Sequence, residues 1–245
     1  MDPPVRTTYA HVALAALPAE LADLHSSLPV GSPIDLELPA GDGDHAGPRT
    51  ELLAQIVASA GFSDIGLAER DGATRVTATR VLTLPDYVGP GMRLLICGLN
   101  PSIYSAEAGA GFARPGNRFW PAMTAAGLTS RPGDPRRLLR HDRIGMTDLV
   151  KRPTRRANEI GADEYRVGVG RVGRLVEWLQ PGALCVVGLT GWRKAIDRRA
   201  HAGEQTERLG GRPVYVMPNT SGLNAHSKPD DFRAHLVAAA ALADT

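Results

Sequence analysis

The stretch RLLICGLNPS, residues 93–102, decides the fold class of this chain. Its first half is an uninterrupted apolar run, which is typical of a strand that is buried on both faces of a parallel sheet. Its second half is polar, and Pro101 directs Asn100 away from helical backbone angles. The stretch therefore predicts a buried strand whose carboxyl end leads into a polar loop.

Two later segments repeat this layout. The run ALCVVGL (183–189) precedes a predicted helix over 191–200, and PVYVMP (213–218) breaks into the polar loop NTSGLNAHS. Further helices are predicted over Asn117–Ala126 and from about Pro229 to Leu242. Strands that alternate with helices at such intervals predict a parallel α/β sandwich. Ligands bind beyond the carboxyl ends of such strands, so the loops starting at Asn100, Thr190 and Asn219 should share a functional edge.

The chain before this region has a different pattern. We expect a small α/β unit over 1–85, a linker within TLPDYVGPG (83–91) and a second domain over 91–245. The expected elements of the unit over 1–85 are a helix over Tyr9–Leu28, a strand over Ile34–Leu38 and a loop over 39–48. A helix capped by Thr50 and closed by Gly61 should follow, and then a hairpin turned at Asp71-Gly72. The layout loosely resembles the C-terminal part of a class I methyltransferase fold. No glycine-rich nucleotide loop follows a strand there, so a structural or interaction appendage is the favoured interpretation.

Charge divides the chain at the same place. The 245 residues have a net charge of +2, but residues 1–90 hold 5 Arg against 12 Asp and Glu. Residues 91–245 hold 23 basic against 14 acidic residues. A change of sign on this scale indicates two units with different partners, and the basic unit is the candidate for nucleic-acid binding.

Cysteine usage and hydropathy exclude several classes of protein. The two cysteines, Cys97 and Cys185, are too few for a disulfide scaffold, a four-cysteine zinc site or a cysteine-held iron–sulfur cluster. None of the seven histidines has metal-ligand spacing with another. No run approaches the roughly 20 apolar residues of a membrane span, and the N-terminus lacks the layout of a signal peptide. We therefore expect a soluble cytoplasmic protein with no metal and no membrane partner.

Four motifs together resemble those of one enzyme family. They are CGLNPS (97–102), FARPGNRFW (112–120), MTDLVKRPTRRANEI (146–160) and MPNTSGL (217–223). Their order and spacing over about residues 91–240 are similar to those of the mismatch-specific uracil-DNA glycosylases, the bacterial relatives of thymine-DNA glycosylase. The resemblance implies a three-layer αβα sandwich around a short, mainly parallel sheet. It also implies a monomeric, monofunctional enzyme that excises uracil, and related damaged bases, from G·U mismatches in double-stranded DNA without a cofactor.

The resemblance assigns roles to individual residues. Asn100 would hold the hydrolytic water, Phe112 would stack on the extruded base, and Leu223 would enter the vacated base stack. An exposed apolar residue at a loop tip is typical of proteins that open DNA in this way. The base-binding residues implied are Gly98, Leu99, Ser105, Phe112 and Asn219. The DNA-binding residues implied are Lys151, Arg152, Ser221, Gly222, Leu223 and Asn224.

The chain departs from the family pattern at several positions. Ser102 replaces a common glycine, Thr220 replaces a usual proline, and Asn224 and Ala225 follow Leu223 where Ser and Arg are usual. Asp148 stands where the closest bacterial relatives have a non-acidic residue. A carboxylate there would be a second catalytic group that activates water or stabilises a sugar cation. The alternative is that Asp148 caps a turn or pairs with Arg152, four residues later.

Basic residues gather in two clusters, and beside a DNA-repair signature we expect them to contact phosphate. The clusters are Arg131, Arg136, Arg137, Arg140 and Arg143, and then Lys151, Arg152, Arg155 and Arg156. His226 is either a phosphate contact or a plain loop residue. Two other functions stay open: a non-catalytic DNA-binding module on the same fold, and a small-molecule nucleotide enzyme. The exposed Leu223 and the basic clusters argue against the second.

Overall fold

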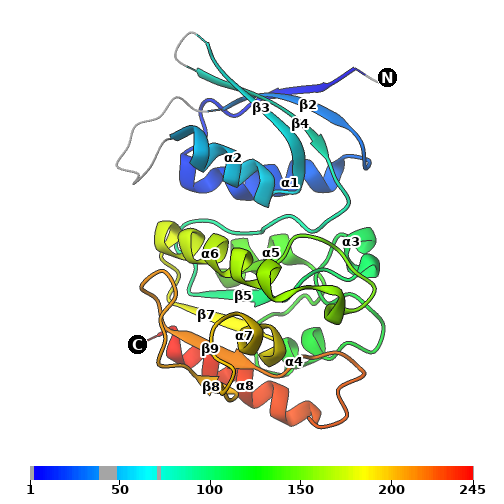
Figure 1. The fold of residues 1–245 in the computed structure, drawn as a ribbon, viewed down its shortest axis with the longest axis vertical. Helices are drawn as coiled ribbons and strands as arrows, with labels where there is room; N and C mark the ends of the chain where they lie inside the picture. Colours follow the sequence, from blue (N-terminus) through cyan, green and yellow to red (C-terminus); the bar gives the residue numbers. More distant parts are fainter. Residues whose placement is uncertain (1–2, 39–48, 71–72, 245) are drawn as a thin grey trace.

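The computed structural model describes residues 3–38, 49–70 and 73–244. Their N-terminal part forms a four-stranded sheet in the order β1-β2-β4-β3, in which β1 and β2 are parallel and the other pairs antiparallel. Two helices pack on one face of this sheet (Figure 1). The elements are β1 (Val5–Thr8), α1 (Leu17–Ser27), β2 (Pro33–Leu38), α2 (Arg49–Ser59), β3 (Phe62–Arg70) and β4 (Ala73–Arg80).

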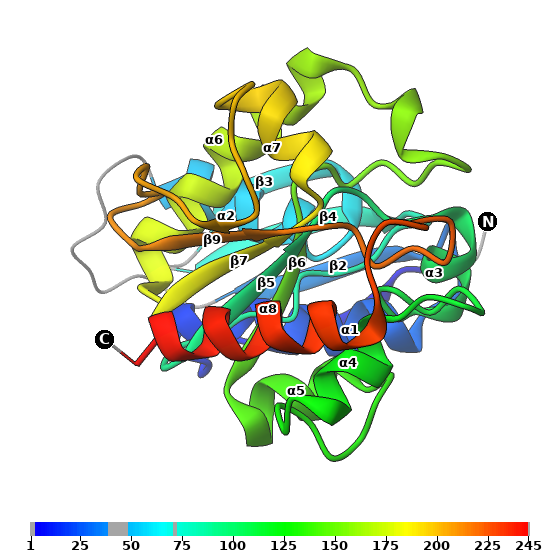
Figure 2. The same cartoon turned by 90° about the horizontal axis from the view of Figure 1, so that it is seen from below.

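The rest of the chain forms the predicted αβα sandwich. Its sheet has the order β6-β5-β7-β9-β8, and only the short edge strand β8 is antiparallel. The strands are β5 (Leu94–Gly98), β6 (Ile144–Asp148), β7 (Ala183–Val187), β8 (Gly203–Glu204) and β9 (Val214–Met217). The helices are α3 (Ile103–Ala108), α4 (Phe119–Ala125), α5 (Pro135–Asp142), α6 (Ala162–Leu179), α7 (Leu189–Ala195) and α8 (Pro229–Leu242). Figure 2 shows α6 and α7 on one side of the sheet, and α4, α5 and α8 on the other.

Strand β5 is buried on both faces, as its apolar run predicts. Leu94 and Ile96 belong to the core under α4 and α8, which contains Phe119. Leu95 and Cys97 belong to the opposite core, under α6 and α7. A continuous apolar sequence is required because neither face of a central parallel strand contacts water.

Some sequence expectations fail for identifiable reasons. The predicted helix over Tyr9–Leu28 begins only at Leu17 (after a short 3-10 turn at Leu14–Ala16), because Val5–Thr8 pairs with β2 and the Tyr9 N–H continues that pairing to the Glu37 carbonyl at 2.7 Å. Thr50 lies inside α2 instead of capping it. Thr190 lies within α7, so no loop begins there. The predicted loop over 39–48 and the turn at 71–72 lie outside the described residues, although the pairing of β3 with β4 fits the hairpin.

Helix α6 was not predicted, because its sequence contains three glycines that lower helix propensity. One of them, Gly168, has a packing reason. A Cβ at this position would lie 2.2 Å from the Leu149 carbonyl oxygen, so the helix reaches the loop after β6 only without a side chain here. Sequence periodicity alone does not reveal such a close approach.

The connecting segment, residues 83–91, is buried over most of its length. Tyr87 exchanges two backbone hydrogen bonds with Met146 of β6, at 3.0 and 2.9 Å. Helices α1 and α2 lie between the N-terminal sheet and α6 (Figure 1). The division of the chain into two domains stays a prediction, since this segment packs against both parts. Across the described ranges, no helix has the length and apolar character that crossing a membrane requires.

Candidate active site

The loops that leave β5 and β6 form one edge of the sandwich. Gly98 and Asp148 are paired at the carboxyl ends of these strands. The backbone N–H groups of Leu149 and Val150 then donate to the carbonyls of Gly98 and Leu99, each at 2.9 Å. The two loops therefore leave the sheet together, and the sequence-predicted residues Asn100 and Asp148 lie at the same edge.

The Asn100 amide is fixed by its nitrogen. Nδ2 donates to Thr154 Oγ1 at 2.7 Å and to the carbonyls of Pro101 and Arg152 at 3.0 and 3.1 Å. Thr154 is itself buried, and its hydroxyl donates to the Arg156 carbonyl at 2.9 Å. Within the described residues, Oδ1 of Asn100 accepts no hydrogen bond. The side chain therefore presents a fixed acceptor, which is what orienting a water molecule requires.

Asp148 is a buried carboxylic acid, only 9% exposed. No donor among the described residues reaches its carboxylate, whereas its backbone carbonyl accepts from Arg171. Burial raises the pKa of Asp148 from 3.8 to about 6; Lys151 opposes this rise and Asp86 adds to it. The alternative that Asp148 pairs with Arg152 is wrong, because the Arg152 guanidinium binds Glu164 through two hydrogen bonds of 2.9 Å.

Asp148 opens onto a cavity of about 320 Å³, including its mouth. The sequence-predicted aromatic Phe112 lines the same cavity and stacks on Phe119, with ring centroids 4.0 Å apart. A Cβ at Gly98 would lie 2.2 Å from Asp148 Oδ1 and 3.5 Å from Phe112 Cζ, so glycine permits this arrangement. The remaining lining is largely apolar and consists of Leu84, Pro85, Tyr87, Gly109, Gly111, Pro135, Met146 and Thr147. Such a site suits a flat heterocycle with a polar edge.

The backbone holds Phe112 in a conformation that few side chains adopt. Its φ is +59°, in the left-handed region. Trp120 of α4 donates from Nε1 to the Gly111 carbonyl at 2.9 Å, which anchors the loop just before Phe112. Strained backbone angles that the surroundings fix are common at functional sites.

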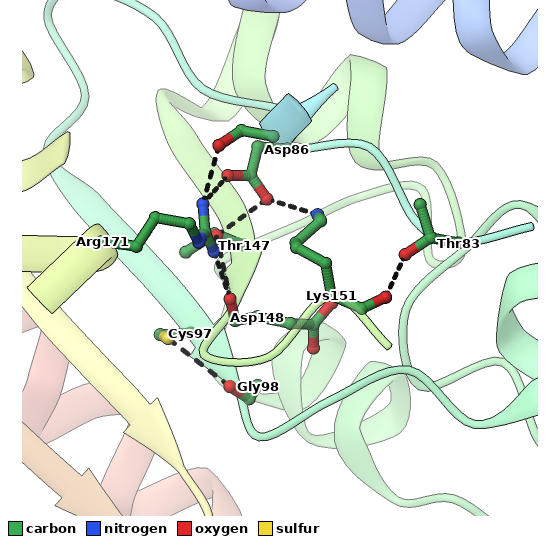
Figure 3. Close-up of polar contacts among 9 residues, drawn as sticks. Thr83, Asp86, Cys97, Gly98, Thr147, Asp148, Lys151 and Arg171 are labelled. Atoms are coloured by element: carbon green, nitrogen blue, oxygen red, sulfur yellow. Dashed lines mark hydrogen bonds and ion pairs between the residues drawn. The ribbon is translucent and has the colours of Figure 1, made fainter. Parts of the chain in front are cut away.

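A buried charge cluster lies behind Asp148 and consists of Asp86, Lys151, Arg171 and Thr147 (Figure 3). The Asp86 carboxylate, 1% exposed, accepts from Lys151 Nζ at 2.7 Å and from Arg171 Nη1 at 2.6 Å. Burial would raise the pKa of Asp86, but Arg171 and Lys151 outweigh it and hold the pKa below 3.8. The Lys151 ammonium is thus bound to a buried carboxylate, an arrangement that does not favour its predicted contact with DNA phosphate.

The loop after β9 carries the predicted wedge. Leu223 is 88% exposed. Arg118 fixes the loop beneath it by donating to the carbonyls of Ser221, Asn224 and Ser227 at 2.8, 2.5 and 2.9 Å. The Asn224 side chain closes the loop by donating to the Asn219 carbonyl at 2.8 Å. An apolar side chain at the tip of a fixed loop is physically suited to insertion between bases.

Other predicted site residues have structural partners. The Ser105 side chain is buried in the N-terminal cap of α3, where Ser102 Oγ donates to Ser105 Oγ at 3.0 Å. Leu99 fills the space beside Gly188 and Gly191 at the start of α7. Ser221 and Gly222 lie in the wedge loop, the first with its carbonyl on Arg118 and the second against Gly116. The assigned roles of these residues stay predictions.

Sequence reasoning missed the partners that complete this site. Asp86, Leu84 and Pro85 lie in the segment interpreted as a linker, and Arg171 lies in the helix that was not predicted. The linker offered no local signal, because an Asp beside a Pro is ordinary in a solvated turn. Part of the first basic cluster is paired with the N-terminal unit although it stays half exposed, since Arg136 and Arg140 bind Asp23 at 2.6 and 2.8 Å.

Within the described residues, no three His, Cys, Asp or Glu side chains are grouped so that they could hold a metal ion. Comparison with known families finds that residues 85–241 match the uracil DNA glycosylase superfamily. The match includes β5, β6, the wedge loop and the charge cluster. It begins within the connecting segment, one residue before Asp86.

Proposed function

Because the chain belongs to the uracil DNA glycosylase superfamily, we propose that it hydrolyses the N-glycosidic bond of uracil, and of related damaged bases, at G·U mismatches in double-stranded DNA. Membership of the superfamily supports a DNA glycosylase in general. The mismatch specificity rests on the four motifs and on the exposed Leu223. A single observation carries the proposal: an asparagine amide held by its nitrogen and a cavity that combines a stacking aromatic ring with a carboxylic acid lie at the same edge of the sheet.

The mechanism starts with extrusion of the base. A base inside a duplex cannot present its glycosidic bond, and uracil opposite guanine is easier to extract than a Watson–Crick partner. The extruded base stacks on Phe112, an interaction worth about 1–3 kcal/mol, while Leu223 fills the vacated stack. The cavity then excludes water from the face of the base.

The chemical step needs one bond broken and one formed. The sugar C1′–N bond breaks and its electron pair leaves with the base, while a water oxygen held by Asn100 Oδ1 bonds to C1′. An amide orients this water but cannot take its proton. The ionised Asp148 carboxylate accepts that proton or stabilises the positive charge on the sugar. Asn100 and Asp148 thus have separate roles, one for positioning and one for charge.

Three further expectations belong to this proposal. The enzyme is monomeric and monofunctional, with no cofactor and no covalent lysine intermediate. It acts in the cytoplasm, on nucleoid DNA. The N-terminal unit, with its loose resemblance to part of a methyltransferase fold, is a structural or interaction appendage.

Base release tests the function directly. End-labelled duplexes with uracil, thymine or ethenocytosine opposite guanine or adenine are incubated with the protein and then cleaved with alkali. We expect strand cleavage at uracil opposite guanine. The Asn100→Ala variant should lose most excision while keeping its affinity for the duplex, because water positioning acts in the chemical step. Tight mismatch binding without base release would instead identify a non-catalytic DNA-binding module.

A further inference from the structure

The charge cluster joins three segments that are distant in sequence. Asp86 comes from the connecting segment, Lys151 from the loop after β6, and Arg171 from α6 (Figure 3). The three side chains are 1%, 19% and 17% exposed. Both oxygens of Asp86 are bound: Oδ1 accepts from Lys151 and, at 2.8 Å, from Thr147, and Oδ2 accepts from Arg171. A buried carboxylate with this many donors holds its cations in fixed positions.

The same cations act on Asp148. Arg171 donates through Nη2 to the Asp148 carbonyl and to Thr147 Oγ1, the latter at 3.0 Å, so it fixes the peptide that carries the carboxylic acid. Lys151 is three residues further along this loop, and its charge favours the ionised form of Asp148. Asp86 acts in the opposite direction through its negative charge.

The other titratable group near Asp148 is Cys97 of the adjacent strand β5, whose side chain lies in the core on the opposite face of the sheet. Burial raises the pKa of its thiol, so it is neutral at physiological pH. The loop over 109–112 and helix α5 contribute only Gly109, Gly111, Phe112 and Pro135 to the cavity. Among the described residues, two acids and two bases therefore decide the charge at this site. Their charges sum to zero when Asp148 is ionised.

We propose that Asp86, Lys151 and Arg171 form a fixed set of charges beside Asp148 that sets the pH range of base excision, in which Lys151 favours the Asp148 carboxylate and the negative charge of Asp86 opposes it. This inference rests on the proposed function. It gives the connecting segment a role in the reaction although Asp86 does not line the cavity formed by Phe112 and Asp148, hereafter the base cavity. It also separates the electrostatic role of Lys151 from its predicted contact with DNA.

Two substitutions should move the pH dependence in opposite directions. In Lys151→Met a cation is lost, so the acidic limb of the single-turnover rate should move to higher pH. In Asp86→Asn an anion is lost, so the same limb should move to lower pH. The expected shift is about one pH unit in each case. A purely structural role would change the rate or the stability without opposite shifts.

The design includes a rescue and a matched control. Lys151→Arg keeps the charge and should keep the wild-type limb. The double variant with Asp86→Asn and Lys151→Met removes one charge of each sign and should return the limb toward wild type, which also addresses poor folding of Asp86→Asn alone. Arg166→Gln removes an exposed cation of α6 that binds Asp163, and should not move the limb.

A second readout does not need turnover. Titration of the Asp148 carboxyl carbon by NMR, assigned with Asp148→Asn, should show the same opposite shifts. An unshifted titration in folded Lys151→Met, or shifts of the same sign in both single variants, overturns the inference. A wild-type chain that releases no uracil overturns the proposed function instead, so the two failures are distinguishable.

Discussion

Asp148 is a carboxylic acid that the fold buries, and no donor from the described part of the chain reaches its oxygens. Because burial raises its pKa to about 6, the group changes charge near physiological pH. If the ionised form assists catalysis, the wild-type rate should fall as pH drops through about 6. Asp148→Asn should lower the single-turnover rate by roughly 10²-fold and lose that dependence. Equal rates for both proteins across pH would assign the chemistry to Asn100 alone.

The same substitution should stabilise the protein at neutral pH. The folded state binds the Asp148 proton more tightly than the unfolded chain, whose pKa is 3.8, so stability falls as pH rises from 3.8 to about 6 and then stays level. A difference of this size corresponds to about 3 kcal/mol. Asp148→Asn should therefore raise the melting temperature at pH 7.5 and have little effect at pH 3.5. A lower melting temperature at pH 7.5 would show that the carboxylate is stabilised by contacts.

Leu223 is the most exposed large apolar residue among those described, and Arg118 holds its loop. Leu223→Ala should slow excision from duplex DNA and weaken retention on the abasic product, because the vacated stack is no longer filled. Excision from single-stranded substrate is the control, since it has no stack to fill. A rate loss of equal size on both substrates would contradict the wedge role.

For single residues, the sequence predicts those proposed to contact DNA better than the buried residues that support them. Asn100, Phe112 and Leu223 stand in loops whose motifs are local in sequence. Asp86 and Arg171 are separated by 85 positions and become partners only through the packing of α6 on the sheet. Local sequence patterns carry no information on such a pair, because the sequence around a charged residue does not show whether its side chain is buried or solvated.

Among the elements, α1 and α5 form a contact of opposite charge. Asp23 of α1 binds Arg136 and Arg140 of α5, and Glu20 adds a contact to Arg140 at 3.5 Å. Two arginines from the cluster predicted to bind phosphate are thus already paired. This interface accounts for part of the excess of Asp and Glu over Arg in the first 90 residues.

Asp23→Asn should release these arginines toward DNA. We expect tighter non-specific duplex binding, with a slope of log K against log salt that is steeper by about 1–2, one contact contributing roughly 0.9. The matched control is Asp163→Asn, which also removes one acid, from an exposed ion pair on α6. Identical slopes for the two variants would show that only net charge matters.

The elements were predictable where periodicity or burial is continuous. The strands β5, β7 and β9 and helix α8 follow from apolar runs and a clear helical face. Strand β6 was not predicted as a strand although IGMTD is fully buried, because its glycine, threonine and aspartate resemble a loop. Helix α6 was missed because Gly168 satisfies a tertiary contact at the expense of local propensity.

For the whole molecule, the connecting segment decides where the chain can be shortened. Thr83 donates from its hydroxyl to the Lys151 carbonyl, and Leu84 and Pro85 line the base cavity. A chain that starts at Asp86 loses all three residues, whereas one that starts at Leu82 keeps them. We expect the longer chain to excise uracil at least 10-fold faster, because only it retains the cavity wall.

Both truncated chains expose the same surface of α6, so their comparison isolates the contribution of residues 82–85. Circular dichroism and melting temperature establish that each is folded. Equal excision rates in two folded chains would show that the wall is dispensable. Inactivity of both would show that the N-terminal unit completes the site.

The buried connecting segment also limits where recombination could join the two parts of the chain during evolution. Recombination tolerates a joint in a solvated tether, because either side can be exchanged without loss to the other. Here a crossover at the composition boundary would separate Leu84 and Asp86 from the residues they contact. The N-terminal unit can therefore be exchanged among proteins only if the joint falls before residue 83. Substitutions in the connecting segment should also be correlated with substitutions in α6 among related sequences.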